Sequence, residues 1–573
     1  MQTRGSDDTA EVGGERGTDK VILGVSGVLA IGFLVWGFVS TSSLGDASGS
    51  ALDWVITNTG WGFVLLTSLF VIFALWLAVS RYGRIPLGGD GEAPEFRTVS
   101  WVAMMFSAGM GIGLMFYGVA EPLSHYISPP PGSVEGGTTD AIRTSMATTL
   151  FHWTLHPWAI YAVVGLSIAY FSYRRKGPQL ISAAFRPLLG KRVDGPAGRV
   201  IDILAIFATL FGSAASLGLG ALQIGSGMKT QGWVDTASTT LLVVVIAVLT
   251  VAFVASAVSG VARGIQWLSN INMVVAIALA VFVFVVGPTV FILDLLPTAL
   301  GSYGQQFAEM ASRTNASGDA AMAEWLSGWT IFYWAWWISW TPFVGMFIAR
   351  ISRGRTIRQF VGGVLLVPSV VSLFWFAIFG GAAISEQAGG AELGQLGIQT
   401  QLFGLLDQYP IEVITSACVM FLVAIFFVSG ADAASLVMGT LTERGSTEPK
   451  RATVVFYGVL TGAVAAVMLI LGDGKAGALT GLQNITIVAA LPFAVIMVGL
   501  CVSLMMALRQ DPLIIREDRG MQIVERAVEH GSDKHGEDRY YLVVESETTA
   551  RARKTAADVT AGGTPPRRRP PEG

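Results

Sequence analysis

The sequence predicts an all-α polytopic membrane protein with about twelve transmembrane helices. Apolar residues make up 52% of the 573 positions and charged residues only 13%, and the mean hydropathy is +0.58. A water-soluble chain of this length could not keep such a composition in solution. Apolar runs of about 20 residues, the length that crosses a bilayer core, recur along the chain. They begin near Val21, Trp61, Val99, Ser145, Val200, Ser238, Trp267, Leu326, Val361, Ile411, Thr453 and Leu482.

The loops between the spans indicate the orientation. Loops that follow even-numbered spans are rich in Lys and Arg, whereas the intervening loops hold only Arg143, Lys229, Arg313 and Lys475. Because positively charged loops stay on the cytoplasmic side, we expect both termini in the cytoplasm and a multi-pass protein of the cell membrane. The first twenty residues are acidic rather than basic, so no cleavable signal peptide is expected there.

After two leading helices the spans divide into two units of five. Each unit crosses the membrane an odd number of times, so the second is inverted relative to the first, as in transporters with a midplane site between broken helices. The two halves do not visibly align, so this inference rests on position alone. The expected segments are a cytoplasmic tail at 1–20, leading helices at 21–98, a first repeat at 99–293, an extracellular loop with room for a surface helix at 294–325, an inverted repeat at 326–508 and a cytoplasmic, partly disordered tail at 509–573.

Span three carries glycine at three alternating positions, Gly109, Gly111 and Gly113. Such a run can free backbone amides and carbonyls inside the membrane, where protein, an ion or a substrate must satisfy them. The alternative is a small-residue face for close helix packing, although such faces more often repeat at four-residue intervals. The spacing alone leaves both interpretations open.

Spans four and eight concentrate aromatic residues. Tyr333, Trp337 and Trp340 share one helix face at i, i+4 and i+7. Membrane tryptophans usually form interfacial belts, but Trp158 and Trp337 fall near the centres of their spans. Several aromatic faces at mid-depth would form a cage for a cation that cannot form hydrogen bonds, each face contributing roughly 0.5–2 kcal/mol. A trimethylammonium group is such a cation.

Charged and reactive residues are scarce within the spans. Asp432 is the clearest acid inside an apolar run, and either a functional role or a structural hydrogen bond would explain it. His152 and His156 lie beside the span-four tryptophans, and we expect no metal-ligand or catalytic group around them. The two cysteines, Cys418 and Cys501, predict neither a disulfide nor a metal site. We therefore expect no enzyme activity, no organic cofactor and, given the net charge of -3, no nucleic-acid partner.

At these positions the sequence resembles the betaine-choline-carnitine transporter family, over roughly residues 20–510. The resemblance implies a leucine-transporter-like fold of two inverted five-helix repeats, alternating access and a homotrimer in contact with membrane lipids. The motifs that carry it are Gly109-Met-Gly-Ile-Gly-Leu-Met-Phe-Tyr-Gly118 followed by Glu121-Pro122, and Trp329-Thr-Ile-Phe-Tyr-Trp-Ala-Trp-Trp-Ile-Ser-Trp340 followed by Thr341-Pro342-Phe343.

The resemblance also implies a substrate site. Matching positions place Trp153, Trp158, Tyr161 and Trp337 in a central cage. Trp336 and Trp340 would line the pathway on either side. The glycine-rich run Gly109, Met110, Gly111 and Gly113 would complete the site. In the family, glycine at the Gly113 position is typical of sodium-coupled betaine carriers and aspartate of proton-coupled choline carriers, which favours a zwitterion that brings its own carboxylate.

Sodium is the coupling ion that the resemblance implies. One departure from the family pattern concerns this site, because Gly430 stands where sodium-coupled members have a serine hydroxyl, and sodium prefers hard oxygen ligands. The implied ligands are Ser107, Met110, Phe426 and Ser429 for one ion, and Thr209, Ser213 and Phe343 for a second.

Together these features predict a secondary transporter that imports a quaternary-ammonium or related zwitterionic compatible solute. Glycine betaine is the first candidate and ectoine the second, with sodium symport. A sodium-independent or proton-coupled choline or carnitine carrier is the alternative within the same class. An osmosensing channel is the alternative from another class, but a channel should show a continuous polar pore lining, which the sequence does not indicate.

Overall fold

The structure is a computed structural model. Its contacts divide the chain into two compact units, residues 1–508 and 509–573. Secondary structure in the described residues is helical, with one isolated bridge between Pro86 and Thr356, which confirms the all-α prediction. The structure describes residues 17–109, 111–259, 262–472, 477–536, 538–541, 543 and 549, without the side chains of 106–109, 259, 262–269, 477 and 478.

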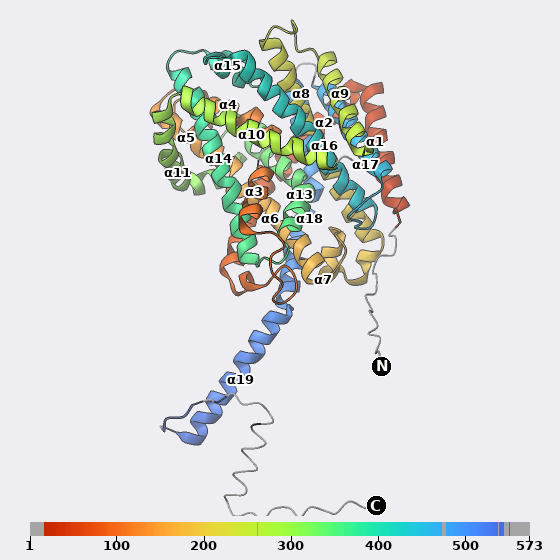
Figure 1. The fold of residues 1–573 in the computed structure, drawn as a ribbon, viewed down its shortest axis with the longest axis vertical. Helices are drawn as coiled ribbons and strands as arrows, with labels where there is room; N and C mark the ends of the chain where they lie inside the picture. Colours follow the sequence, from red (N-terminus) through yellow and green to blue (C-terminus); the bar gives the residue numbers. More distant parts are fainter. Residues whose placement is uncertain are drawn as a thin grey trace, which may run out of the picture. The chain divides into compact units, whose positions relative to one another are not determined.

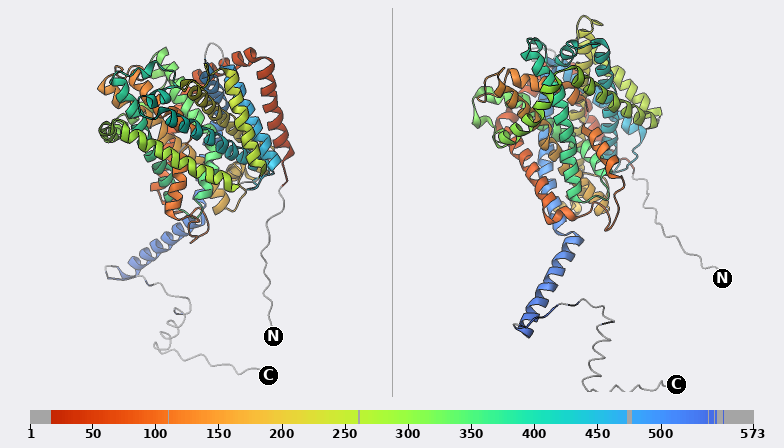
Figure 2. Two further views of the ribbon diagram at one scale, coloured as in Figure 1. Left: turned by 45° about the horizontal axis from the view of Figure 1, so that its top comes forward. Right: turned by 60° about the vertical axis from the view of Figure 1, so that its left-hand side comes forward.

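The first unit is a bundle of long helices that lie side by side (Figures 1 and 2). Its α-helices are α1 Lys20–Val39, α2 Thr41–Val79, α3 Thr98–Gly109, α4 Ile112–Ile127, α5 Thr139–Trp153, α6 Leu155–Ala169, α7 Arg186–Leu189, α8 Pro196–Thr230, α9 Thr239–Ser259, α10 Ala262–Val286, α11 Thr289–Ala311, α12 Ala320–Leu326, α13 Phe332–Ile351, α14 Ile357–Ala388, α15 Gln401–Asp407, α16 Glu412–Thr442, α17 Arg451–Leu471 and α18 Gly477–Arg509.

Length and composition identify the membrane-spanning helices. Among the described residues, nine helices are long and apolar enough to cross a bilayer, and a tenth span results if α10 and α11 count as one. These two helices meet at a bend of 109°. Helix α11 extends to Ala311 and therefore occupies the first part of the segment expected to be an extracellular loop. A polytopic membrane protein is therefore confirmed. The count of twelve spans and the inverted repeats stay predictions.

Two of the predicted spans are interrupted. Span three is divided into α3 and α4, and Gly111 precedes α4 in a fully extended conformation (φ −171°, ψ −178°). Span four is divided at Thr154 into α5 and α6. Pro157 lies in the first turn of α6, where its missing N–H removes no helical hydrogen bond, whereas a continuous helix would bring its ring against the Trp153 carbonyl. Both interruptions follow from the local sequence.

Helix α13 is preceded by a π-helical turn at Ser327–Ile331 and contains Pro342. A proline inside a helix leaves the carbonyl four residues earlier, here that of Ile338, without its usual donor. The Thr341 hydroxyl donates to this carbonyl at 2.7 Å. α13 packs against α6, α8 and the π-turn, so the aromatic helix lies among the interrupted ones.

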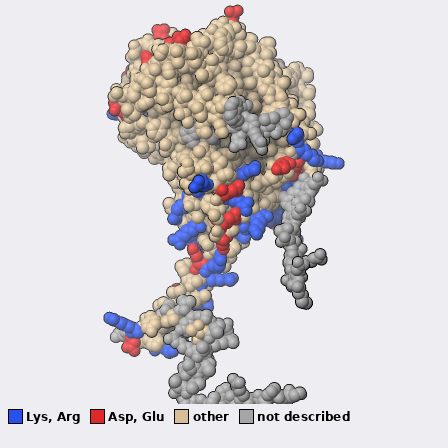
Figure 3. Space-filling view, in the orientation of Figure 1, with Lys and Arg blue, Asp and Glu red and all other residues tan. Residues whose placement is uncertain are grey.

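The outer faces of the first unit are apolar. Exposed residues include Val28 on α1, Ile72 on α2 and Val251 on α9. In the face that Figure 3 shows, most of the surface carries no charged atoms, and the charged residues of this unit gather toward its ends. Apolar side chains that would be costly to expose to water are stable in the hydrocarbon of a bilayer.

The second unit contains α19, Pro512–His535. Asp511 caps its first turn, because its carboxylate accepts a hydrogen bond from the backbone N–H of Leu513 at 2.9 Å. Proline at the first helical position supports the same start. Met521, Ile523 and Val524 are exposed on this helix.

Candidate functional site

The start of α4, the start of α6 and the aromatic helix α13 enclose a small cavity of about 40 Å³. Eight of the predicted substrate residues meet there. Met110 is outside the described residues, and the surroundings of Gly109 are not described. The cavity is lined by Gly111, Gly113, Leu114, Trp153, Pro157, Trp158, Tyr161, Trp336, Trp337, Trp340, Val344 and Ser372.

Among the four predicted cage rings, those of Trp153, Trp158, Tyr161 and Trp337, the rings that contact one another are nearly perpendicular. Trp337 lies 4.9 Å from Trp153 at 74° and 6.3 Å from Tyr161 at 78°, measured between ring centroids and planes. Trp158 lies 5.3 Å from Tyr161 at 77°. The cavity between them has room for only a few water molecules. A larger ligand would therefore have to push these rings apart.

Indole N–H groups hold the tryptophans of this site in fixed orientations. Trp337 Nε1 donates to the His152 carbonyl at 3.0 Å, and Trp336 Nε1 donates to Ser216 Oγ at 3.0 Å. Trp340 Nε1 donates to the Gly212 carbonyl, also at 3.0 Å. A buried indole N–H normally requires such an acceptor. Each indole nitrogen is thus satisfied at the ring edge, and Trp336 and Trp337 also stack on each other, with centroids 4.7 Å apart and planes at 14°.

Gly113 lies directly against two of these rings. A Cβ atom at this position would be 2.8 Å from Trp336 Cη2 and 2.9 Å from Trp153 Cη2. Both separations are shorter than the optimal contact of about 3.5–4.0 Å between carbon atoms. Any side chain here would therefore displace the rings of Trp336 and Trp153, which gives a steric reason for glycine.

A larger cavity of about 310 Å³ adjoins the cage and shares Gly111, Trp340 and Val344 with it. Asp432 lines this second cavity. Among the described residues, its carboxylate forms no hydrogen bond or ion pair that would account for it as a purely structural residue. The structural alternative for Asp432 is thus not supported by the contacts.

The residues implied for sodium are only partly brought together. Ser213, Phe343, Phe426 and Ser429 line the larger cavity, together with Gly430, Asn272 and Asp432. Thr209 lies one turn before Ser213 on α8 but does not line this cavity, and its buried hydroxyl donates to the Ala205 carbonyl at 2.8 Å. The Ser107 side chain and Met110 fall outside what the structure describes. Sodium binding by either group of implied ligands stays a prediction.

A buried carboxylate that the sequence analysis did not single out lies beside the cage. Glu121, on α4, is fully buried. Its Oε1 accepts from His152 Nδ1 at 2.6 Å, and its Oε2 accepts from Trp153 Nε1 at 2.5 Å and from the Tyr333 hydroxyl. Three donors on two other helices therefore converge on one side chain. This network connects the cage ring of Trp153 to α4 and α13.

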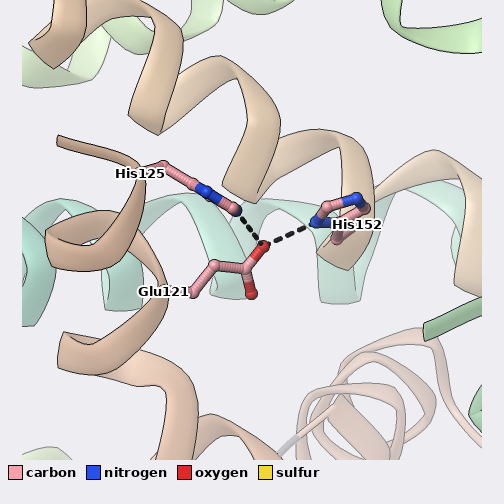
Figure 4. Close-up of side chains that lie close together, drawn as sticks. All are labelled: Glu121, His125 and His152. Carbon is pink, nitrogen blue, oxygen red and sulfur yellow. Dashed lines mark hydrogen bonds and ion pairs between the residues drawn. The ribbon is translucent and has the colours of Figure 1, made fainter. Parts of the chain in front are cut away.

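The expectation that no metal-ligand group surrounds His152 is wrong. Figure 4 shows Glu121, His125 and His152 pointing toward one another, with ligand atoms that all lie within 4.8 Å. The three side chains come together because α4 packs against α5. Among the described residues, Glu121 is fully buried, whereas Asp432 is only partly buried. The available signal was an acid close to the glycine-rich run, since an ionisable residue within a span is functional by default.

Comparison with known proteins gives the family of the chain. The model of the betaine/carnitine/choline family of transporters matches residues 21–513. The betaine/ectoine transporter LcoP of Corynebacterium glutamicum is 44% identical over 550 residues, covering 95% of this chain and 86% of that protein. The glycine betaine transporter OpuD of Bacillus subtilis is 46% identical over 480 residues, covering 83% and 92%. Glycine betaine transporter 1 of Vibrio parahaemolyticus is 41% identical over 499 residues, covering 86% and 94%.

Proposed function

The chain belongs to the betaine/carnitine/choline family of transporters, and from this premise we propose that it imports a zwitterionic compatible solute with a quaternary-ammonium or related cationic centre. Glycine betaine is the first candidate and ectoine the second, the substrates for which the relatives are named. We further propose sodium symport by alternating access.

The observation that carries this proposal is the group of four aromatic rings around one cavity, Trp153, Trp158, Tyr161 and Trp337. A quaternary ammonium has no N–H to donate, so hydrogen-bonding residues cannot recognise it. Aromatic faces attract it through their quadrupole, with up to about 2 kcal/mol for a desolvated contact. The cage side chains are buried, which favours the upper part of that range.

The other end of a zwitterion is a carboxylate, and the start of α4 suits it. Gly111 offers no side chain to cap this helix, so the backbone N–H groups of its first turn are available to a ligand. The positive end of a helix dipole adds to this attraction. None of the described residues that line the cage is acidic. A cation without its own carboxylate, such as choline, would therefore lack a counter-charge.

The orientation and the assembly are parts of the same proposal. The basic loops favour a cytoplasmic location of both termini in the cell membrane. On that orientation the larger cavity, which Asp432 lines, lies on the cytoplasmic side of the cage. Glu121, His125 and His152 then lie on the outer side of the cage. A homotrimer is the assembly that the family resemblance implies.

Uptake measurements test the proposal. The purified full-length protein is reconstituted in proteoliposomes and given betaine, ectoine, choline or carnitine, each with and without an inward sodium gradient. Saturable uptake of betaine or ectoine that requires the gradient is the expected result. Uptake of choline driven by a proton gradient would replace this proposal with the alternative carrier. Flux that does not saturate would indicate a channel.

A further inference from the structure

We propose that Glu121, His125 and His152 form a binding site for one divalent transition-metal ion of the zinc class, beside the aromatic cage. The potential ligand atoms are one carboxylate oxygen and one ring nitrogen from each histidine. Glu121 and His125 are four residues apart and therefore lie on the same face of α4. His152 approaches from the facing helix, α5, as Figure 4 shows.

The spacing of these atoms is close to what a tetrahedral ion requires. His152 Nδ1 lies 2.6 Å and His125 Nε2 lies 3.6 Å from Glu121 Oε1. Zinc bonds to nitrogen and oxygen are about 2.0–2.2 Å long, so its ligand atoms stand roughly 3.3 Å apart. The ring nitrogens of the two histidines lie within 4.8 Å of each other, so side-chain rotations that lengthen the first separation and shorten the second would bring the three atoms to this spacing. The carboxylate and His152 would then exchange their mutual hydrogen bond for bonds to the metal.

His125 gives a second, independent indication. Its side chain is only 1% exposed, and neither ring nitrogen has a hydrogen-bond partner within the described part of the chain. The ring points at Glu121 Oε1 (Figure 4). Buried polar groups are nearly always satisfied, so an orphaned imidazole requires an explanation such as a water molecule or an ion. A metal bound through Nε2 would satisfy it.

The surroundings already supply the second layer of contacts that metal sites use. His152 Nε2 lies 3.0 Å from Thr330 Oγ1, and a metal-binding histidine typically donates its other N–H to such an oxygen. The second Glu121 oxygen is held by Trp153 and Tyr333. Both contacts fix the orientation of a ligand. They can persist while Glu121 Oε1 and His152 Nδ1 bind the metal.

The ligand types and charges define the class of ion. Two imidazoles and one carboxylate suit zinc and its neighbours, whereas calcium and magnesium prefer sites made of oxygen alone. The carboxylate is the only formal negative charge of the triad, which favours a cation in this buried place. The positive charge of Arg313 opposes a bound cation at both histidines. However, its guanidinium is ion-paired with Glu309 Oε1 at 3.0 Å.

Metal binding to the purified full-length protein tests the site. The chelator-stripped protein is titrated with zinc by calorimetry, and the parent is compared with His125→Asn. We expect one zinc per chain in the parent and an affinity at least roughly tenfold lower in the variant, because a direct ligand is lost and loss of an outer contact alone already costs 10–100-fold. An equal affinity in both proteins would overturn the proposal and leave a water molecule as the partner of His125.

A control variant and a second measurement accompany this test. His530 and His535 are histidines of the second unit, and the double variant His530→Asn/His535→Asn should keep the site. If that variant loses the zinc instead, binding is adventitious and the proposal fails. Should His125→Asn not fold, cobalt added to the parent protein provides another test. Visible absorption bands of a tetrahedral histidine site support the proposal, and their absence contradicts it.

The functional consequence rests on the proposed transport function. A metal ion bound by both α4 and α5 would hold these helices together next to Trp153, and the cage must open to admit its ligand. Added zinc should therefore slow uptake by the parent, whereas uptake by His125→Asn should be the same with and without zinc. Uptake that zinc does not affect in the parent would remove this consequence. The calorimetric result does not depend on transport, so failure of the proposed function and failure of the metal site can be distinguished.

Discussion

Glu121 Oε2 accepts a hydrogen bond from the indole Nε1 of Trp153 at 2.5 Å. A fully buried carboxylate thereby sets the orientation of an aromatic ring that lines the proposed substrate cage. Hydrogen bonds to a charged acceptor are about twice as strong as neutral ones. The position of Trp153 is consequently determined by a residue that does not itself line the cavity.

Replacing Glu121 by Gln should weaken substrate binding while the protein still folds. His152, Trp153 and Tyr333 all direct donors at the two carboxylate oxygens. An amide keeps one acceptor oxygen and presents an NH2 group at the other position, which faces the Trp153 N–H when it replaces Oε2 and forces a change of the His152 tautomer when it replaces Oε1. An unsatisfied buried donor costs about 1–3 kcal/mol. If about 1 kcal/mol of this is lost from the orientation of Trp153, the KM for betaine rises about fivefold.

A matched control for this variant is Asp202→Asn. Asp202 is also buried, and its carboxylate accepts from the backbone N–H and the hydroxyl of Ser182, but it does not line the cage. We expect this variant to lower the thermal stability and to leave KM unchanged. Equal KM values for Glu121→Gln and the parent would show that the carboxylate has no influence on the cage.

Replacing Trp337 by Leu should reduce betaine affinity by about thirtyfold. Leucine keeps much of the apolar character but removes a ring face, and the loss of one desolvated cation-π contact costs about 2 kcal/mol. Binding of betaine to the purified variant measures the effect. Trp61, 61% exposed on α2, is the matched tryptophan outside the cage. Trp61→Leu should bind betaine as tightly as the parent. If Trp337→Leu and Trp158→Leu also bind betaine as tightly as the parent, the aromatic cage does not exist.

Replacing Gly113 by Ala should also weaken binding, through sterics alone. The added Cβ would be 2.8 Å from Trp336 and 2.9 Å from Trp153, so both rings must move away from their hydrogen-bonded positions. Overpacking of this kind typically costs 1–3 kcal/mol. A loss of about 1.4 kcal/mol, within that range, would lower the betaine affinity roughly tenfold. Gly62→Ala is the control, because no atom lies within 4 Å of a Cβ at Gly62. Unchanged affinity in Gly113→Ala would mean that the ring positions are not important for binding.

Replacing Gly430 by Ser should lower the sodium concentration that gives half-maximal uptake. Gly430 lines the larger cavity together with Ser429 and Phe426, two of the residues implied for sodium. A Cβ at Gly430 would meet no atom within 4 Å, so a serine fits and adds a hydroxyl oxygen, the kind of ligand that hard cations prefer. Uptake is measured over a series of sodium concentrations for both proteins. Insensitivity to sodium in both would show that the coupling assignment is wrong.

Much of the fold could be predicted from sequence because it depends on local properties. Apolar runs and basic loops identify membrane helices, since the bilayer imposes a minimum length and excludes charge. The interruptions near Gly111 and Pro157 also have local causes. Trp158 and Trp337 were expected at mid-depth from their positions within the spans, and the family resemblance placed both in one cage. The structure lines one cavity with both.

Only the tertiary structure decided which polar groups meet. His152 donates to Glu121 across 31 positions of the chain, and Trp337 donates to the His152 carbonyl across 185. Hydropathy averages over a whole helix and therefore cannot tell which face of α4 contacts α5. For this reason Asp432 stood out as the conspicuous acid, whereas Glu121 was seen only as part of a motif. A buried carboxylate is stable only where other helices supply its donors, and those donors are brought to Glu121 by the packing of α4, α5 and α13.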